Sequence, residues 1–392
     1  MGALSNIRVL DLSTMLAGPF GAMMLGDLGA EIIKIETPDG DGTRGFPPRT
    51  QNGTSLYYMA YNRNKKSVVI NLKTPEGRQI FYDLVKQADV VWDNFRPGII
   101  EKLGIDYNTI KAINPRIISA SVTGFGSDNP YGNRPTYDLC IQAISGVLSV
   151  TGEPDRPPVK LGVPMADIGG GWYAVVGVLA ALMERERTGV GQRVDVSMLD
   201  GLVSLHGYEA VYYLNTGVMP EPLGTMHRSH APYQIFKTED YYIAIVVALD
   251  KFWQSLCKAM ELSNEVEERY ATVDLRYQHR NELIELLEKV FLTKSTEYWL
   301  QKLEEADVPC GAVNRMDSAL AEPALLHREM VVDVAKGSDT VKLLGNPIKL
   351  SNSTSEYTCP PDLGQDTDMV LQDILGYSPE KVRGYRDSNV VK

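Results

Sequence analysis

Apolar and polar positions alternate along the first 200 residues in a pattern that predicts strands and helices in turn. Short apolar runs predict buried strands at positions 8–12, 31–35, 68–71, 90–92, 117–122 and 193–196. Helical spacing separates these runs, as between Thr74 and Gln87, where Thr74 is a capping residue and Pro75 takes the first helical position. Strands that alternate with helices predict a mostly parallel sheet covered on both faces. Ligands of such sheets bind at the carboxyl ends of the strands.

The pattern changes after about residue 205. The stretch from Tyr213 to Thr225 is richer in Gly and Pro and indicates a linker. One apolar strand at 241–249 follows, and then three amphipathic helices at 251–262, 280–292 and 295–306. We therefore predict an α/β protein with a large domain built on a Rossmann-like sheet and a smaller α+β domain. The predicted bounds are 1–205 for the large domain, completed by 345–392, 226–325 for the small domain, and 206–225 and 326–344 for the linkers.

Composition and charge narrow the function classes. The chain has 392 residues, of which 44% are hydrophobic, so it can bury a sizeable core without disulfides. Its formal net charge of −11 argues against nucleic acid as the main partner, because such proteins need a basic face. Residues 1–110 are balanced, with 12 Lys and Arg against 12 Asp and Glu. This neutral third is where we expect an anionic ligand to bind.

The four cysteines point to a reducing compartment. Cys140, Cys257, Cys310 and Cys359 are far apart and form no Cys-x-x-Cys pair, which disfavours a disulfide framework or a zinc ribbon. The longest apolar run, Tyr173 to Met183, is shorter than the ~20 residues that span a bilayer. The N-terminus also has no basic start followed by an apolar stretch. We therefore expect a cytoplasmic protein with no membrane partner.

Standard motifs for phosphate-cradling loops, dinucleotide sites, nucleophile elbows and zinc proteases do not occur in the sequence. Only two of the five histidines, His227 and His230, are close together, and no carboxylate with ligand spacing accompanies them. A solvated loop explains that pair better than a metal site. The sequence therefore predicts no bound metal.

The most unusual segment is Pro164-Met-Ala-Asp-Ile-Gly-Gly-Gly-Trp172. Its single acid, Asp167, precedes three glycines and a long apolar helix that we predict from Gly171 to about Arg187. Glycines at a helix start leave amide N–H groups accessible, and the helix dipole favours an anion there. Asp167 would then stay ionised and could act as a nucleophile, while the N–H groups of Gly169 and Gly170 hold an oxyanion. The alternative is a helix-capping Asp followed by a glycine-lined packing surface.

Several short motifs are weak individually but specific in their order and spacing. They are Val9-Leu-Asp-Leu12 with Ala17-Gly-Pro19, Gly29-Ala-Glu-Ile-Ile-Lys-Ile-Glu36, Asn64-Lys-Lys-Ser67, Asn71-Leu-Lys-Thr-Pro-Glu-Gly77, Asp93-Asn-Phe-Arg-Pro-Gly98, Tyr137-Asp138 with Gln142-Ala-Ile-Ser-Gly146, and Gly189-Val-Gly-Gln-Arg-Val-Asp-Val-Ser197. With them the chain resembles, along essentially its whole length, the class III CoA-transferases, the family of formyl-CoA and carnitine CoA-transferases.

The resemblance implies a covalent mechanism at Asp167. Its carboxylate would attack the thioester of an acyl-CoA and give an aspartyl mixed anhydride, which CoA then converts to an aspartyl-CoA thioester. An acceptor carboxylate would take over the CoA by the same steps in reverse, without ATP, metal or a permanently bound cofactor. The partners implied are an acyl-CoA donor, of which succinyl-CoA is one candidate, and a carboxylic acid. The family also implies an interlocked homodimer, with 226–234 shaping the acceptor pocket.

The CoA contacts of the family carry over to a set of positions in the N-terminal part of the chain. They are Thr37, Ile70, Asn71, Leu72, Lys73, Asn94, Phe95, Arg96, Lys102, Thr123, Gly124 and Phe125. Among them, Lys73, Arg96 and Lys102 would meet the phosphates. The alternative for each of the three is a solvated surface cation.

Two other functions remain open. The alpha-methylacyl-CoA racemases share the fold and resemble this chain around Asp167, but they pair that Asp with a His that matches Tyr137 here. A racemase needs two bases, and a tyrosine with an ordinary pKa of about 10 is a poor one. Tyr137 is therefore a candidate substrate contact. A catalytically silent CoA-binding protein is the third class, and it is disfavoured because Asp167 and its glycines are present.

Overall fold

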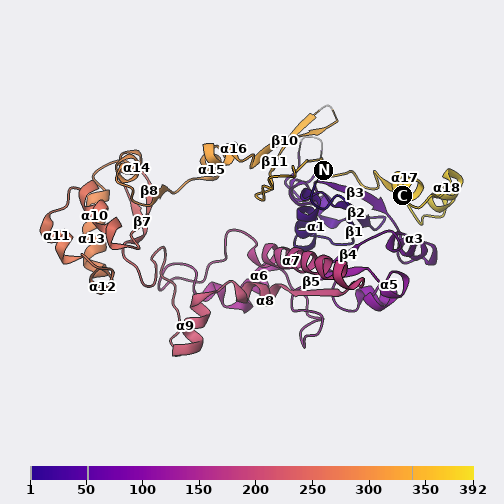
Figure 1. The fold of residues 1–392 in the computed structure, drawn as a ribbon, viewed down its shortest axis with the longest axis horizontal. Helices are drawn as coiled ribbons and strands as arrows, with labels where there is room; N and C mark the ends of the chain where they lie inside the picture. Colours follow the sequence, from indigo (N-terminus) through magenta and orange to yellow (C-terminus); the bar gives the residue numbers. More distant parts are fainter. Residues whose placement is uncertain (1, 51–52, 338) are drawn as a thin grey trace. The chain divides into compact units, whose positions relative to one another are not determined.

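A computed structural model describes residues 2–50, 53–337 and 339–392 (Figure 1). The chain forms two compact units. Unit 1 comprises Met1–Val147, Leu161–Ala210 and Pro323–Lys392, and unit 2 comprises Leu148–Lys160 and Val211–Glu322. This division differs from the predicted domain bounds, because 148–160 belongs to unit 2 and the predicted linker at 326–344 contains a β-hairpin of unit 1.

The core of unit 1 is a six-stranded parallel sheet in the order β3-β2-β1-β4-β5-β6. Its strands are β1 (Arg8–Asp11), β2 (Glu31–Glu36), β3 (Lys65–Val69), β4 (Val90–Asp93), β5 (Ile118–Thr123) and β6 (Arg193–Ser197). Each lies within three residues of a predicted apolar run, so the predicted mostly parallel α/β sheet is confirmed. The strand order reverses between β1 and β4, and ligands of such sheets bind at the carboxyl ends of the strands on either side of that point.

Helices cover both faces of this sheet (Figure 1). Val9 and Val90 point to one core, which contains α1 (Ala17–Asp27) and α7 (Met165–Thr188). Their neighbours Leu10 and Val91 point to the other core. That core contains the helices α3 (Pro75–Val85), α4 (Ile99–Leu103), α5 (Tyr107–Ile113) and α18 (Pro379–Asp387), together with the π-helix η3 (Val370–Ile374). Because successive residues of the inner strands enter different cores, these strands are apolar on both faces, as the sequence pattern indicated.

The remaining elements of unit 1 are short. They are η1 (Gly42–Gly45), α2 (Leu56–Tyr61), α6 (Asp138–Ser145), α8 (Met198–Ser204), α16 (Pro323–His327), the antiparallel hairpin of β10 (Val331–Lys336) and β11 (Asp339–Leu344), and α17 (Thr367–Met369). Two further helices, η2 (Val147–Ser149) and α9 (Tyr208–Thr216), lie where the chain passes from one unit to the other. The C-terminal segment returns to the sheet, since Ile70 forms a β-bridge with Val391.

Unit 2 is a small α+β body. Its antiparallel sheet has the order β7-β8-β9, with strands β7 (Tyr233–Lys237), β8 (Tyr242–Val246) and β9 (Cys310–Ala312). Its helices are α10 (Asp250–Ala259), α11 (Asn264–Arg269), α12 (Val273–Gln278), α13 (Arg280–Phe291), α14 (Thr296–Glu305) and α15 (Met316–Leu320). The core is aromatic, with Trp253, Phe291 and Trp299 buried together. The suggested role of 226–234 in an acceptor pocket stays a prediction.

Helix α7 begins at Met165, six residues before the predicted start, so the glycine triplet lies inside the helix. The reason is packing. A Cβ atom on Gly171 would come within 2.8 Å of the Ala17 carbonyl oxygen on α1, and one on Gly170 within 3.0 Å of Val122 on β5. By length and composition alone α7 could cross a membrane, but half of its most apolar stretch is buried. Its contacts with α1 and the sheet identify it as a core helix.

Candidate active site

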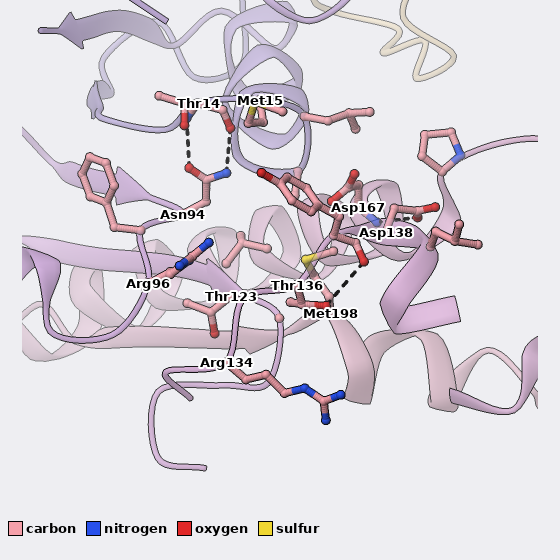
Figure 2. Close-up of a pocket in the computed structure, with 18 of the residues that line it drawn as sticks. Thr14, Met15, Asn94, Arg96, Thr123, Arg134, Thr136, Asp138, Asp167 and Met198 are labelled. Carbon is pink, nitrogen blue, oxygen red and sulfur yellow. Dashed lines mark hydrogen bonds between the residues drawn. The ribbon is translucent and has the colours of Figure 1, made fainter. Parts of the chain in front are cut away.

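A cavity of about 840 Å³ lies in unit 1 at the carboxyl ends of β1, β4 and β5, beside the first turn of α7. Its volume is in the range of small-molecule sites. Figure 2 shows the residues around it, with Asp138 and Asp167 on one side and Asn94 and Arg96 on the other. The cavity therefore lies where the reversal in strand order places ligands.

Two hydrogen bonds fix the loops at this reversal point. The Thr14 N–H donates to the side-chain oxygen of Asn94 over 2.9 Å, and the Asn94 amide donates to the Thr14 carbonyl over 2.7 Å. These bonds join the loop after β1 to the loop after β4 (Figure 2). The Trp92 indole also donates to the Gly18 carbonyl over 3.0 Å. The cavity wall is thus fixed before any ligand binds.

Asp167 lies in the first turn of α7 and lines the cavity. Burial, together with the nearby negative charge of Asp138, raises the pKa of Asp167 to about 7. The expectation that the helix N-terminus keeps this carboxyl fully ionised is therefore wrong, because burial and the Asp138 charge both favour its protonated form. A carboxyl group with such a pKa is ionised in half of the molecules near neutral pH and is more basic than an ordinary aspartate.

The predicted oxyanion role of the glycines is also wrong. Gly169 and Gly170 are buried within α7, and neither lines the cavity. A helix leaves free N–H groups only in its first turn, whereas these two glycines follow that turn. The sequence left open that the glycines form a packing surface, and the close contacts of Gly170 agree with this. It also left open that Asp167 caps the helix, but the capping residue of α7 is Pro164.

Two tyrosines that the sequence did not single out share the cavity with Asp167. Tyr57 and Tyr61 are one helical turn apart on α2, and both line the cavity. Burial and the Asp167 charge raise the pKa of Tyr57 to about 12 and also raise that of Tyr61. Both hydroxyls therefore stay protonated and can donate hydrogen bonds. In the sequence, only the four-residue spacing of the two tyrosines could have indicated that they lie on the same face of a helix.

The residues predicted to contact CoA divide between two adjoining cavities. Those in the 840 Å³ cavity are Asn94, Phe95, Arg96, Thr123 and Gly124, and Tyr137 lines it as well. A second cavity of about 510 Å³ is lined by Thr37, Ile70, Asn71, Leu72, Lys73, Phe95 and Lys102. Phe95, Thr14 and Ile99 line both cavities. The structure therefore brings together every predicted contact except Phe125, which is 3% exposed and packs in the core.

Exposed cations line these cavities. Lys73 and Lys102 line the smaller one, and Arg96 and Arg134 line the larger one. Within residues 2–50, 53–337 and 339–392, none of the four forms an ion pair with an acidic side chain. They can therefore meet the phosphates or carboxylates of a ligand. Sequence reasoning missed Arg134, which precedes the Tyr137-Asp138 motif in the loop before α6 and is not part of it.

The described part of the chain contains no group of three or more His, Cys, Asp and Glu side chains that could hold a metal ion. The histidine pair noted in the sequence lies in unit 2, where Nδ1 of His230 is 3.3 Å from Nδ1 of His227.

Comparison with known proteins identifies the class. The sequence model described as CoA-transferase family III matches residues 4–367. An acyl-CoA transferase of Fusarium pseudograminearum is 39% identical over 404 residues, which cover 100% of this chain and 88% of the fungal one. The succinyl-CoA:glutarate CoA-transferase of Homo sapiens is 36% identical over 392 residues, which cover 99% of this chain and 90% of the human one.

A solved structure agrees with this comparison. The crystal structure of a CAIB/BAIF family protein from Brucella suis superposes with a TM-score of 0.86 at 35% identity, covering 95% of this chain and 99% of that one. The chain belongs to CoA-transferase family III. It is an enzyme of that family, and CoA thioesters are its substrates.

Proposed function

We propose that this enzyme moves CoA from an acyl-CoA donor to a carboxylic acid through covalent intermediates on Asp167. The observation that carries the proposal is the position of Asp167. It is the acid of the first turn of α7, it lines the 840 Å³ cavity, and burial gives it a pKa of about 7. Its ionised form is a stronger nucleophile than an ordinary aspartate and is well populated near neutral pH.

In the first half of the reaction, an Asp167 carboxylate oxygen attacks the carbonyl carbon of the donor thioester. The C–S bond breaks, and CoA leaves as a thiolate while a mixed anhydride forms. The thiolate then attacks the aspartyl carbonyl carbon of that anhydride. This second step gives the aspartyl-CoA thioester and releases the donor acid, which carries away one oxygen atom of Asp167.

In the second half, the acceptor carboxylate attacks the aspartyl-CoA thioester and again forms an anhydride and a CoA thiolate. The thiolate attacks the acceptor carbonyl carbon, so the acceptor leaves as a CoA thioester. Asp167 is regenerated with one oxygen atom that came from the acceptor. The thioester bond energy is conserved throughout, so the sequence needs no ATP.

The hydroxyls of Tyr57 and Tyr61 and the cation of Arg96 line the same cavity as Asp167. We assign them to the carbonyl and carboxylate oxygens of the two substrates, since the hydroxyls remain protonated donors and Arg96 forms no ion pair with an acid in the part of the chain that the structure describes. In this role of stabilising negative oxygen atoms, these groups take the place of the Gly169 and Gly170 N–H groups that the sequence suggested. Tyr137, which is 64% exposed, has a place at the cavity rim that suits a substrate contact.

CoA binding should depend on the cations of both cavities. We propose that the nucleotide part occupies the 510 Å³ cavity and that the thioester reaches Asp167 in the larger one, since the two cavities adjoin at Phe95. Lys73→Ala and Arg96→Ala should each weaken CoA affinity by about 10- to 100-fold, because a charge-assisted hydrogen bond is lost. Calorimetric titration with CoA measures this. Lys86→Ala, which removes an exposed lysine outside both cavities, is the control.

CoA affinity that stays at the wild-type value in both variants, or that falls equally in the Lys86→Ala control, would show that CoA binds elsewhere.

The racemase alternative is disfavoured at one position. A racemase would need a second base opposite Asp167, and the corresponding residue is Tyr137, which is an exposed phenol.

Incubated with an acyl-CoA and a second carboxylic acid, the purified enzyme should form the CoA ester of that acid. With an alpha-methylacyl-CoA in deuterated water, it should incorporate no alpha deuterium. Mass spectrometry of the CoA esters reads both results. Deuterium incorporation without transfer to any acid would make the racemase the right assignment.

A donor–acceptor screen, read by mass spectrometry of the CoA esters, identifies the substrates. The human relative uses succinyl-CoA and glutarate by name, so we propose succinyl-CoA as the first donor to test and dicarboxylic acids as the first acceptors. The cations Arg96 and Arg134 suit a second carboxylate, because both line the reaction cavity.

We also propose that the enzyme is a homodimer. Helix α7 exposes Trp172, Val176 and Met183 by 45%, 64% and 78%, which is an unusual amount of apolar surface for a core helix. A second copy of the chain would cover it. Sedimentation equilibrium should give twice the mass of the chain, and a monomer at micromolar concentration would contradict the proposal.

A further inference from the structure

The first turn of α7 is held by a side chain from another helix. Asp138 is the first residue of α6, and one of its carboxylate oxygens, Oδ1, accepts hydrogen bonds from two backbone N–H groups of α7. These are the N–H groups of Ala166, at 2.9 Å, and of Asp167 itself, at 3.4 Å. Figure 2 shows Asp138 and Asp167 on the same side of the cavity. No residue of α7's own N-terminus supplies such a bond, since its capping residue is Pro164.

The other oxygen of Asp138 is anchored in turn. Its Oδ2 accepts a hydrogen bond of 2.6 Å from the side-chain amide of Gln142, one turn further along α6. Gln142 is completely buried, and its side-chain oxygen accepts the Leu161 N–H over 2.9 Å. The carboxylate of Asp138 is therefore fixed on both sides. It connects α6, the segment that precedes α7 and the turn that carries Asp167.

We propose that Asp138 is the positioning residue of the transfer reaction, holding the first turn of α7 so that the Asp167 carboxyl group faces the cavity and keeping a negative charge beside it. This inference rests on the proposed function of Asp167. The hydrogen bonds to Ala166 and Asp167 fix the backbone from which the nucleophile extends. The adjacent charge makes the Asp167 carboxylate more basic, and a more basic carboxylate is a better nucleophile towards a thioester.

The other charged and titratable groups around Asp167 cannot supply this effect. Tyr57 and Tyr61 on α2 are neutral, because burial and Asp167 itself raise their pKa values. Arg96 and Arg134, which line the same cavity, are cations and would act in the opposite direction. Tyr137 is an exposed phenol beside Asp138. Asp138 is the only carboxylate that shares the cavity with Asp167 among the residues that the structure describes.

The test follows the first covalent step as a function of pH. The enzyme is incubated with an acyl-CoA and hydroxylamine, and the rate of hydroxamate formation on Asp167 is measured by peptide mass spectrometry. In the wild type this rate should rise with pH to a plateau as Asp167 ionises. Asp138→Asn removes the charge and the acceptor for Gln142, so the midpoint should move to lower pH by about one unit and the plateau should fall about 10- to 100-fold.

A second variant separates position from charge. Gln142→Leu keeps the Asp138 charge but removes its anchor, so the midpoint should stay near the wild-type pH while the plateau falls. This variant also carries the test if Asp138→Asn does not fold. Glu184→Gln, which removes an exposed carboxylate at the other end of α7, is the control and should match the wild type in both respects.

A midpoint in Asp138→Asn that equals the wild-type midpoint would overturn the inference, since a merely structural role changes the plateau alone. So would a wild-type plateau in Gln142→Leu. If the wild type itself forms no hydroxamate on Asp167, the proposed function fails. If the wild type reacts there and only the Asp138 and Gln142 effects are missing, the proposed function stands and this inference alone fails.

Discussion

Asp167→Asn should abolish CoA transfer while the protein stays folded and still binds CoA. The amide keeps the size of the side chain but has no anionic oxygen to attack a thioester, so the rate should fall by on the order of 10⁴-fold. The steady-state transfer rate and calorimetric CoA binding are the two measurements. Asp200→Asn, in the first turn of α8, is the matched control, because it removes an exposed carboxylate from a neighbouring helix.

The same variant should be more stable than the wild type at neutral and alkaline pH. The pKa of Asp167 is about 7 in the folded protein and near 3.8 in the unfolded chain, so the folded state holds the proton more tightly. The wild type therefore loses stability as pH rises from about 4 to about 7, and asparagine removes that loss. The gain should be roughly 2–4 kcal/mol at about pH 8 and should vanish near pH 4.

Urea unfolding of both proteins at the two pH values measures this difference. If Asp167 were only a helix-capping residue, Asn would replace it with little change in stability at any pH, Ala would cost about 1 kcal/mol, and activity would survive both. An active Asp167→Asn enzyme, or one that is less stable than the wild type at alkaline pH, would contradict the assignment.

Lys65→Met should cost about 3–5 kcal/mol of the free energy of unfolding, because it removes the one ammonium that pairs directly with the buried Asp11 carboxylate among the described residues and leaves only the more distant Lys34 charge. The Lys65 ammonium is completely buried on β3 and lies 2.9 Å from an oxygen of Asp11 on β1, and it also donates to the Pro19 carbonyl and the Asn62 side chain. Asp11 in turn accepts the Ser13 N–H at the start of the loop that lines both cavities.

The neighbouring residue supplies the control. Lys66 is partly exposed and pairs with Glu31, so Lys66→Met should cost less than about 1 kcal/mol. Urea unfolding at neutral pH compares the two variants. Equal losses would show that the buried ion pair has no special role in the fold. A double variant with Asp11→Leu should recover most of the loss, since the unpaired charge is then gone.

The sequence predicted the sheet well because parallel strands that are buried on both faces are continuous apolar runs. The strands β1, β2, β4 and β5 coincide with such runs, whereas the edge strand β6 alternates valines with charged residues and is mostly exposed on its other face. The capping Thr74 starts α3 as expected. The hairpin at 331–344 was missed, because charged residues interrupt the apolar positions of both strands and each strand has a single buried residue. The start of α7 was misplaced because a run of glycines indicates a helix end, whereas here the glycines allow α1 to approach closely.

The site was predictable only in part. Resemblance supplied Asp167 and the CoA contacts, and local sequence explained why a single acid before a long helix is unusual. Tyr57, Tyr61, Arg134 and the role of Asp138 depend on distances between separate elements, which no local pattern encodes. The pKa of Asp167 was misjudged for the same reason. Its burial and its acidic neighbour come from tertiary packing, whereas the helix dipole can be inferred from sequence alone.

In the proposed mechanism Asp167 is covalently modified during turnover, and isotope transfer detects that modification. The enzyme is incubated with an acyl-CoA and an acceptor acid labelled with ¹⁸O in its carboxylate, and the peptide that contains Asp167 is analysed by mass spectrometry. We expect ¹⁸O in the Asp167 side chain after turnover, because the regenerated carboxylate takes one oxygen atom from the acceptor. Rapid transfer of CoA to the labelled acid with no ¹⁸O in that peptide would contradict the covalent mechanism.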